Sequence, residues 1–316
     1  MVNVKVINMD NFKIHFFNTI WSDLIILEKD NHFALVDTAS AFYYPDIKEY
    51  FEELKIEKLD FIILTHFHSD HYGNIINILN DYKIDTLYFR EYTNYELIGS
   101  DGKVACEEYN KKEKEKSDNI IKIAKEKTKL IIVDENLNEI NFRGINIDIY
   151  CNKLIVKEMY ENPSSPYYQE RKFNDNYNSI TLFIKINNHT IYLGGDATDS
   201  NASIDELKYL SSNAIKEIYK KYNINSIDIY KTAHHGGPGN NNLDLLTLIN
   251  PKYAIITNTD KWLDNWSTYD NINKATNNEC KILKTDFYIH IFDLSNDEIK
   301  LMQKEAESMF LKLKKD

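Results

Sequence analysis

Three histidines and an aspartate lie within six consecutive positions, directly after a run of four apolar residues. The segment reads Thr-His-Phe-His-Ser-Asp-His from Thr65 to His71, and the apolar run is 61–64. A buried strand that ends in a turn can bring such closely spaced side chains to one point. Neutral imidazole and carboxylate are the donors that zinc and similar divalent ions prefer. We therefore expect a metal site at the end of a buried strand, with a solvated polar loop as the alternative.

Two later features extend this cluster. Asp196 follows an apolar segment and two glycines, and the pair His234 and His235 follows the apolar segment 227–230 and precedes two further glycines. Glycine allows the backbone to pass close to a neighbouring group. A Gly-Gly-Asp turn alone is more often only a turn. Because each feature follows a separate predicted strand, we expect the three to form one site.

Composition limits the classes of function. The 316 residues are 43% hydrophobic and carry a formal net charge of −11, which does not suit coating of nucleic acid or an anionic membrane. Cys106, Cys151 and Cys280 are widely spaced and predict reduced thiols. No signal-peptide pattern and no membrane-spanning run is seen, so we expect a cytoplasmic protein without a membrane partner.

Apolar periodicity predicts a mixture of strands and helices. Strands are expected at 2–7, 13–17, 24–27, 33–36, 61–64, 86–89, 130–133, 140–142, 145–150, 180–186, 190–193, 227–230 and 253–256. Helices are expected at 45–54, 207–222, 243–249 and 296–315, and the charged segment 104–127 predicts a solvated helix. No linker rich in Pro, Gly or Ser divides the chain. We therefore expect a single domain of residues 1–316, with approximate halves 1–135 and 136–316.

Taken together, these motifs resemble the metallo-β-lactamase superfamily. The resemblance is carried by the segment ending at His71, by Leu-Gly-Gly-Asp196, by Ala-His-His-Gly236 and by Val-Asp-Thr at 36–38, where Ala39 replaces the usual glycine. Within the superfamily the chain looks most similar to the hydrolase domain of the DNA-uptake competence channel, through Asn178-Ser179 and the later motifs. It is also similar to pneumococcal-type phosphorylcholine esterases, through 59–71, 174–176 and 191–196.

The resemblance implies an α/β fold, a four-layer αββα sandwich with mixed sheets and two metal ions between them. The metal ligands that it implies are His66, His68, Asp70, His71, Asp196 and His235. The first two belong to one metal position, the next two to the second, and Asp196 bridges both. His235 is favoured over His234 to complete the set, and Asp37 would orient a ligand histidine through its other ring nitrogen. Zinc is the expected metal, with manganese or iron as alternatives.

The chain departs from the superfamily at one ligand. Most members have a further ligand histidine between the first cluster and the bridging aspartate, and here only His189 lies in that interval. His189 belongs to an Asn-Asn-His turn at the far end of the strand leading to Asp196, so we expect it to be exposed and not a ligand. We also expect the position formed by His66 and His68 to bind its metal more weakly.

These features predict a metal-dependent hydrolase acting on a small-molecule or other phosphodiester substrate, with a metal-bridging hydroxide held by Asp196 and Asp70 as nucleophile. His234 would stabilise the transferred oxygens or protonate the leaving group, and Asn178 and the segment 257–262 would shape the pocket. Aromatic residues could stack on a base or enclose a choline-like cation, with surface packing as the alternative. They are Tyr160, Tyr167, Tyr168, Trp262 and Trp266.

Other functions stay open at this point. A nuclease acting on DNA or RNA fits the competence-like pattern, but the acidic charge and the lack of a basic cluster beside the site count against it. A β-lactamase proper is disfavoured, as is a redox diiron enzyme, whose relatives have Glu where this chain has His68. A non-catalytic binding or sensor protein on a hydrolase scaffold is the alternative from another class, and the complete ligand set argues against it.

Overall fold

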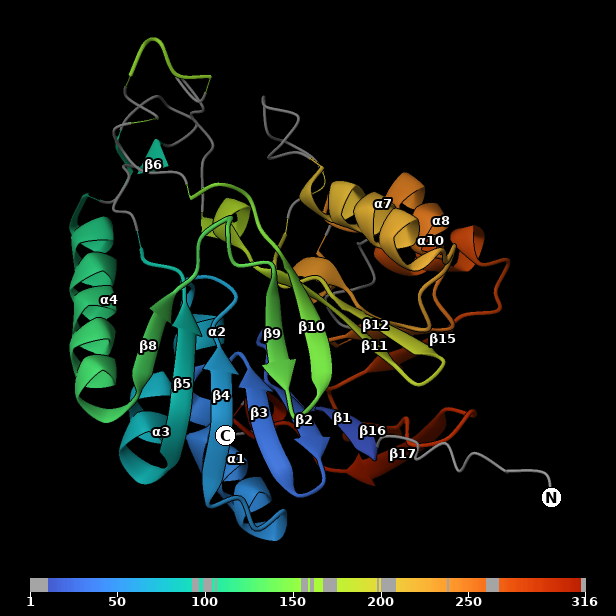
Figure 1. The fold of residues 1–316 in the computed structure, drawn as a ribbon, viewed down its shortest axis with the longest axis horizontal. Coiled ribbons are helices and arrows are strands. Elements are labelled where there is room, and N and C mark those ends of the chain that lie inside the picture. Colours follow the sequence, from blue (N-terminus) through green and yellow to red (C-terminus); the bar gives the residue numbers. More distant parts are fainter. Residues whose placement is uncertain are drawn as a thin grey trace, which may run out of the picture.

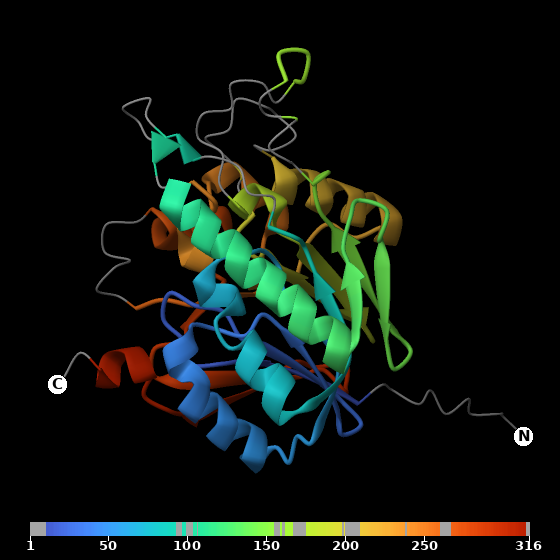
Figure 2. The same cartoon turned by 90° about the vertical axis from the view of Figure 1, so that its left-hand side faces the viewer.

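Two β-sheets pack face to face, and helices cover the outer face of each (Figures 1 and 2). The structure is a computed structural model. It describes residues 11–92, 97–98, 104–105, 107–154, 159, 162–166, 175–197, 199, 209–237, 239–259 and 267–313. The predicted α/β, four-layer αββα arrangement with mixed sheets is confirmed.

Within the described residues, the first sheet has eight strands. In spatial order they are β17 (Lys300–Glu305), β16 (Tyr288–Asp293), β1 (Phe12–Phe16), β2 (Ile25–Lys29), β3 (His32–Val36), β4 (Lys58–Ile63), β5 (Lys83–Phe89) and β8 (Lys129–Ile132). The pairs from β17 to β3 are antiparallel, and those from β3 to β8 are parallel.

The second sheet has seven strands in the described part of the chain. Their spatial order is β15 (Lys281–Lys284), β14 (Tyr253–Ile256), β13 (Ile229–Lys231), β12 (His189–Leu193), β11 (Thr181–Ile186), β10 (Ile145–Tyr150) and β9 (Glu139–Phe142). The strands from β12 to β15 are parallel, so their carboxyl ends lie at one edge of the sheet. A separate short pair consists of β6 (Leu97–Ile98) and β7 (Val104–Ala105).

The main core lies between the two sheets and follows the period of two that strands impose. In β11, Leu182 and Ile184 point toward the opposite sheet, while Phe183 packs beneath the helices of the second sheet. Phe61 of β4 and Phe142 of β9 meet edge to face across the interface, with ring centroids 5.5 Å apart. Residues of both sheets share this core, which supports the proposal that the chain is one domain.

Helices close the two outer layers. The first sheet is covered by α1 (Tyr44–Glu53), α3 (Ile75–Asp81) and α4 (Glu107–Lys127), and the second by α7 (Leu210–Tyr222), α8 (Leu243–Ile249) and α10 (Thr268–Ala275). Within α4, Ile120 and Ala124 are buried, whereas Lys114 and Asp118 form an ion pair at the surface. The charged segment thus forms the predicted helix with a solvated face from Glu107 onward, and its buried apolar face is an addition to the prediction.

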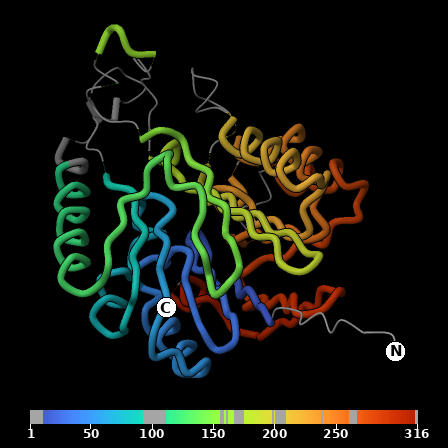
Figure 3. Tube along the Cα trace, in the orientation of Figure 1, coloured from blue at the N-terminus to red at the C-terminus, as the bar shows by residue number. Residues whose placement is uncertain are grey.

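The predicted C-terminal helix at 296–315 is wrong. Residues 300–305 form strand β17, which pairs antiparallel with β16, and the helix α11 covers only Met309–Lys312. The apolar spacing of this segment suits a helix, but pairing with the edge strand β16 satisfies its backbone groups and overrides that local preference. In Figure 3 the red tube of this C-terminal segment lies beside the blue tube of the N-terminal segment. The sequence halves 1–135 and 136–316 therefore do not correspond to the two sheets.

Most other predicted elements are confirmed within a few residues, and 243–249 and 253–256 agree at both ends. The strand expected at 2–7 lies outside the described residues. Among the described residues, no helix is both long and apolar enough to cross a membrane.

We expect Phe142→Ala to lower the free energy of unfolding by about 3–5 kcal/mol, because it empties a buried contact between the sheets. If the chain is one domain, both sheets should lose stability in a single cooperative transition on denaturant unfolding followed by circular dichroism and fluorescence. Ile132→Ala is the control, since that strand residue is 42% exposed and its loss should cost far less. Two separate transitions, only one of them shifted by Phe142→Ala, would contradict the single domain.

Candidate metal centre

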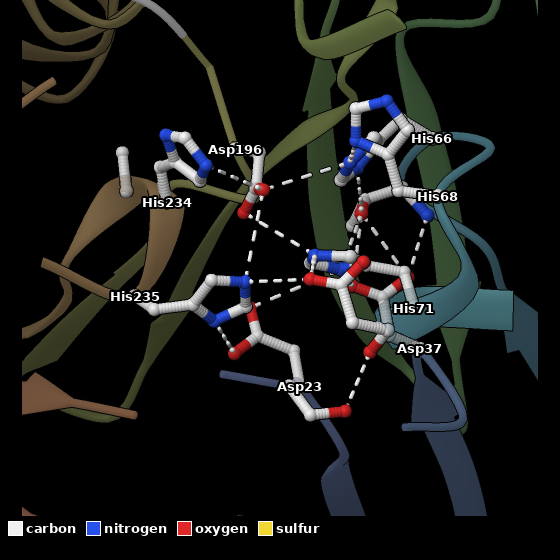
Figure 4. Close-up of polar contacts among 12 residues, drawn as sticks. Asp23, Asp37, His66, His68, His71, Asp196, His234 and His235 are labelled. Carbon is white, nitrogen blue, oxygen red and sulfur yellow. Dashed lines mark hydrogen bonds and ion pairs between the residues drawn. The ribbon is translucent and has the colours of Figure 1, made fainter. Parts of the chain in front are cut away.

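The three predicted features meet at one edge of the sandwich, between the sheets (Figure 4). His66 and His68 lie in the loop after β4, and Asp70 and His71 lie on the short helix α2 (Ser69–Tyr72) that follows. Asp196 follows β12, and the pair 234–235 lies in the turn η3 (Ala233–Gly236) after β13. Strand ends from both sheets thus supply side chains to one cluster, as expected from the sequence.

Asp196 lies at the centre of the cluster. Its Oδ1 is 3.3 Å from His71 Nε2, and its Oδ2 is 3.6 Å from His66 Nε2 and 3.7 Å from His235 Nε2. The carboxylate is 1% exposed. Gly195 precedes it with a φ of +51°, and a Cβ there would lie 3.0 Å from the carbonyl oxygen of Ile180. Glycine is therefore needed to bring Asp196 into this position.

Two groups of donor atoms share Asp196. In the first, His66 Nε2 and His68 Nδ1 are 3.0 Å apart, and ligand atoms of both lie within 4.8 Å of Asp196. In the second, Asp70 Oδ2 is 3.0 Å from His235 Nε2 and 3.6 Å from His71 Nε2. We refer to these groups as position 1 and position 2.

The chemistry of the cluster fits divalent metal ions. Among the described residues, His71 Nε2 and Asp196 Oδ1 are buried and have no hydrogen-bond partner, although they face each other. Leaving buried polar atoms unsatisfied costs free energy, and a cation between them would satisfy both. Imidazole and carboxylate donors suit zinc, manganese or iron, so the donor set does not select among the metals expected from the sequence.

Burial and charge shift the titration of these rings. Burial lowers the pKa of His66 well below its usual value, and the nearby His71 lowers it further. Burial also disfavours the charged form of His71, but the carboxylate of Asp196 and its neighbours raise the pKa of this ring well above its usual value. The same balance raises the pKa of His235 to about 9. Without metal, the cluster therefore retains protons that a metal ion must displace.

Asp37 lies where the resemblance predicts it. Its Oδ2 is 2.8 Å from His71 Nδ1, and its Oδ1 accepts a hydrogen bond of 2.8 Å from the backbone N–H of Thr65. The carboxylate thus holds Nδ1–H, so that Nε2 of His71 faces Asp196. Ala39, which replaces the usual glycine, has a φ of +56°, a conformation that glycine adopts without strain.

The turn η3 sends its two histidines in different directions. His234 and His235 both have left-handed backbones, with φ of 50° and 51°. The side chain of His235 is 1% exposed and faces Asp70, while that of His234 is 39% exposed and lies 3.8 Å from Asp196 Oδ2. A Cβ at position 237 would lie 2.9 Å from the carbonyl oxygen of His234, so glycine is required there. This geometry brings the ring of His235, and not that of His234, into the buried cluster, and its role as the ligand stays a prediction.

Sequence reasoning missed Asp23, Lys231 and the role of Thr257. Asp23 Oδ1 is 3.1 Å from His235 Nδ1, and Lys231 Nζ forms a buried ion pair with Asp23 Oδ2. Burial alone would raise the pKa of Asp23, but Lys231 and His235 hold it well below its usual value. The sequence showed only that an aspartate and a lysine adjoin the ends of predicted strands. It did not indicate that two residues so far apart in the chain would be in contact.

The other predicted residues have mixed outcomes. Asn178 is buried, and its side-chain amide donates a hydrogen bond to Asp175 Oδ1 (3.1 Å). The other oxygen of Asp175, Oδ2, accepts a hydrogen bond from the backbone N–H of Phe67 (2.5 Å), the residue between the two histidines of position 1. A catalytic role for Asn178 stays a prediction. His189 was expected to be exposed, which is wrong, because its ring is buried against the carbonyl oxygen of Asn296 (2.6 Å).

The aromatic candidates for substrate contact lie outside the described residues. They are Tyr160, Tyr167, Tyr168, Trp262 and Trp266.

We expect one metal ion to bind more tightly than the other, with position 2 the tighter. A buried carboxylate holds Nδ1 of His71, whereas Nδ1 of His66 lies 3.1 Å from the neutral hydroxyl of Thr65. Zinc titration with native mass spectrometry should show two separate steps, and His66→Ala should remove the weaker one only. Two ions of equal affinity, or loss of the tighter ion in His66→Ala, would contradict the assignment.

Metal binding should weaken as the pH falls between about pH 9 and pH 6. His235 holds a proton below its pKa of about 9, and the metal must displace it, so each pH unit should cost at least about tenfold in affinity. The cost is larger where His71, whose pKa is also raised, loses a proton as well. Chelator competition across this range measures the slope. A flat profile would show that no proton leaves on binding.

Comparison with known proteins supports the superfamily resemblance. The family model described as the metallo-beta-lactamase superfamily matches residues 22–121 of the chain, which include Asp23, Asp37 and the segment from His66 to His71. A search of curated protein sequences finds no match.

Solved structures give similarities at low identity. The metallo-beta-lactamase fold protein YhfI from Bacillus subtilis is 11% identical, covering 93% of this chain and 100% of that one, with a TM-score of 0.49. A diphosphatase from the PhnP family is 11% identical, covering 78% and 86%, with a TM-score of 0.43. The archaeal superfamily protein ST1585 from Sulfolobus tokodaii is 16% identical, covering 65% and 75%, with a TM-score of 0.38. The family match confirms that residues 22–121 carry the sequence signature of the metallo-beta-lactamase superfamily.

Proposed function

We propose that this protein is a metal-dependent phosphodiesterase with two metal positions. The observation that carries the proposal is that one buried carboxylate, Asp196, lies close to two groups of donor atoms, one with His66 and His68 and the other with His71 and His235. His66 and His68 would hold one ion with Asp196. Asp70, His71 and His235 would hold the other with the same carboxylate. Two ions supply a nucleophile at neutral pH by lowering the pKa of bound water, and they neutralise charge on a phosphoryl group.

His234 has the position of a substrate-facing residue. Its Nδ1 lies 3.2 Å from Asn240 Oδ1, and Asn240 in turn donates to the carbonyl oxygen of Ala197 (2.9 Å). This chain of contacts directs Nε2 toward Asp196 and the exposed side of the cluster. In its protonated form, His234 can donate from Nε2 to a phosphoryl oxygen or to the leaving-group oxygen.

Asp70 would act on the attacking water, whereas His234 would act on the phosphoryl group or the leaving group. Its side chain is 30% exposed, which makes it the most accessible carboxylate of the cluster. The backbone carbonyl of Asp70 accepts hydrogen bonds from Ser22 Oγ (2.7 Å) and the Asp23 N–H (3.2 Å), so the main chain at this point is fixed. A carboxylate held in this way can orient an attacking water and accept its proton.

The charge of the chain favours a small substrate over nucleic acid. The net charge is −11, and the described cluster contains Asp23, Asp37, Asp70 and Asp196 against a single lysine, Lys231, which is already paired. Nucleic-acid binding depends on cationic contacts to phosphates. Nuclease activity and a non-catalytic sensor role stay as alternatives, and no specific contact in the cluster favours either.

The test is hydrolysis of bis(p-nitrophenyl) phosphate and p-nitrophenyl phosphorylcholine after loading with zinc or manganese. We expect metal-dependent turnover that Asp196→Ala abolishes, because both positions lose their shared ligand. His234→Ala should lower kcat by about 10²- to 10⁴-fold while the metal content stays unchanged. His32→Ala is the matched control, since this histidine is 43% exposed and its ring lies beside Asp60, outside the cluster.

The outcomes separate the alternatives. Turnover retained by Asp196→Ala would reject the proposal. Absence of turnover in the fully loaded protein would favour a sensor or a narrower substrate, whereas cleavage of DNA or RNA with a steep salt dependence would favour a nuclease. A preference for the choline ester would show that the cationic group that stays on the phosphate is recognised, because nitrophenolate is the leaving group of both esters.

A further inference from the structure

A second buried cluster lies behind His235, on the side of the ring away from Asp70 and Asp196. Asp23 Oδ1 accepts a hydrogen bond of 2.7 Å from Thr257 Oγ1, and both atoms lie near His235 Nδ1, at 3.1 and 2.9 Å. Lys231 Nζ donates to the other oxygen, Asp23 Oδ2. All four residues are at most 2% exposed. No part of the proposed chemistry above uses Asp23, Lys231 or Thr257.

The members of this cluster come from both sheets. Asp23 lies in the loop between β1 and β2, Lys231 is the last residue of β13, and Thr257 follows β14. Asp23 is further fixed by its main chain, because its N–H donates to the carbonyl oxygen of Asp70 (3.2 Å) and its carbonyl accepts from the N–H of Ala39 (2.8 Å). The ion pair between Asp23 and Lys231 therefore joins the two halves of the site across the interface between the sheets.

The contacts determine which nitrogen of His235 is free. In the neutral ring, the carboxylate oxygen beside Nδ1 requires that this nitrogen carries the proton, which leaves the lone pair on Nε2. Nε2 is the atom that faces Asp70 Oδ2 at 3.0 Å. A deeply buried Asp23 would in turn be unstable as a lone charge, and Lys231 is the cation that compensates it.

We propose that Asp23 and Lys231 are positioning residues for His235. Asp23 fixes the ring and its tautomer so that Nε2 is directed into position 2, and Lys231 holds Asp23 at the required place and neutralises it. The inference rests on the proposed function in that it takes His235 as a metal ligand. It goes beyond that function by assigning a lysine–aspartate pair, 208 positions apart in sequence, to the control of one ligand.

The experiment measures cobalt(II) binding to the protein by absorption spectroscopy and chelator competition, which needs no turnover. Lys231→Met alone leaves a buried carboxylate uncompensated and is expected to lose stability as well as affinity. The decisive variant is therefore the double substitution Asp23→Leu with Lys231→Met, which removes both charges and retains side-chain volume. We expect it to fold and yet to bind cobalt at position 2 about 10- to 100-fold more weakly, with altered visible absorption bands.

Two further variants complete the design. Thr257→Val removes only the hydroxyl that contacts Asp23 and His235, and we expect a smaller loss of affinity in the same direction. If the double variant does not fold, the cobalt affinity of Thr257→Val tests the positioning role instead. Lys252→Met is the matched control, because it removes an exposed lysine that pairs with Asp228 just before β14 and β13, at the ends of these strands away from the cluster. It should leave cobalt binding unchanged.

Failure of this inference is distinguishable from failure of the proposed function. If the folded double variant binds cobalt with the affinity and spectrum of the unaltered protein, the positioning role is overturned. Unchanged binding in Thr257→Val, where the double variant is unfolded, would overturn it equally. If the unaltered protein binds cobalt but hydrolyses neither nitrophenyl ester, the phosphodiesterase proposal fails, while the cobalt affinities of the variants still decide the role of Asp23 and Lys231.

Discussion

The burial of several carboxylates and imidazoles at one point between two sheets is the constraint on which the site depends. Asp196 is 1% exposed and lies within 4 Å of ring nitrogens from His66, His71 and His235. Charges at such depth are tolerated only when they are paired or bound to a cation. The histidine rings therefore depend on one another and on the buried carboxylates for their charge balance. The unsatisfied atoms that face one another belong to the same network.

The fold supplies that arrangement by bringing strand ends together. Parallel strands β12, β13 and β14 of one sheet end at the same edge, and β3 and β4 of the other sheet end opposite them. Each strand is held in register by an apolar core that both sheets share. Polar residues placed just after these strands must then meet, since a core packed in this way leaves little freedom at the ends of its strands.

Left-handed backbone conformations refine the placement of individual side chains. His234 and His235 are consecutive and both have positive φ, so that one ring is directed inward and the next toward the open side. Asp37 also has a positive φ, of 62°, where it turns back to hold Nδ1 of His71. Such conformations cost free energy for residues other than glycine, and they cluster at functional sites where surrounding contacts maintain them.

The amino-acid sequence by itself determined most of the strands and helices and the cluster at 66–71, because each depends on short-range spacing. The layer architecture was implied by the resemblance of the motifs to a known superfamily. The sequence also indicated that Asp196 and the pair 234–235 belong with that cluster, because each follows a predicted strand. Tertiary structure alone decided that 300–305 pairs as a strand with β16, and that Asp23 and Lys231 meet behind His235. These outcomes depend on contacts between residues far apart in the chain, and no local pattern of side chains encodes which distant partner will be near.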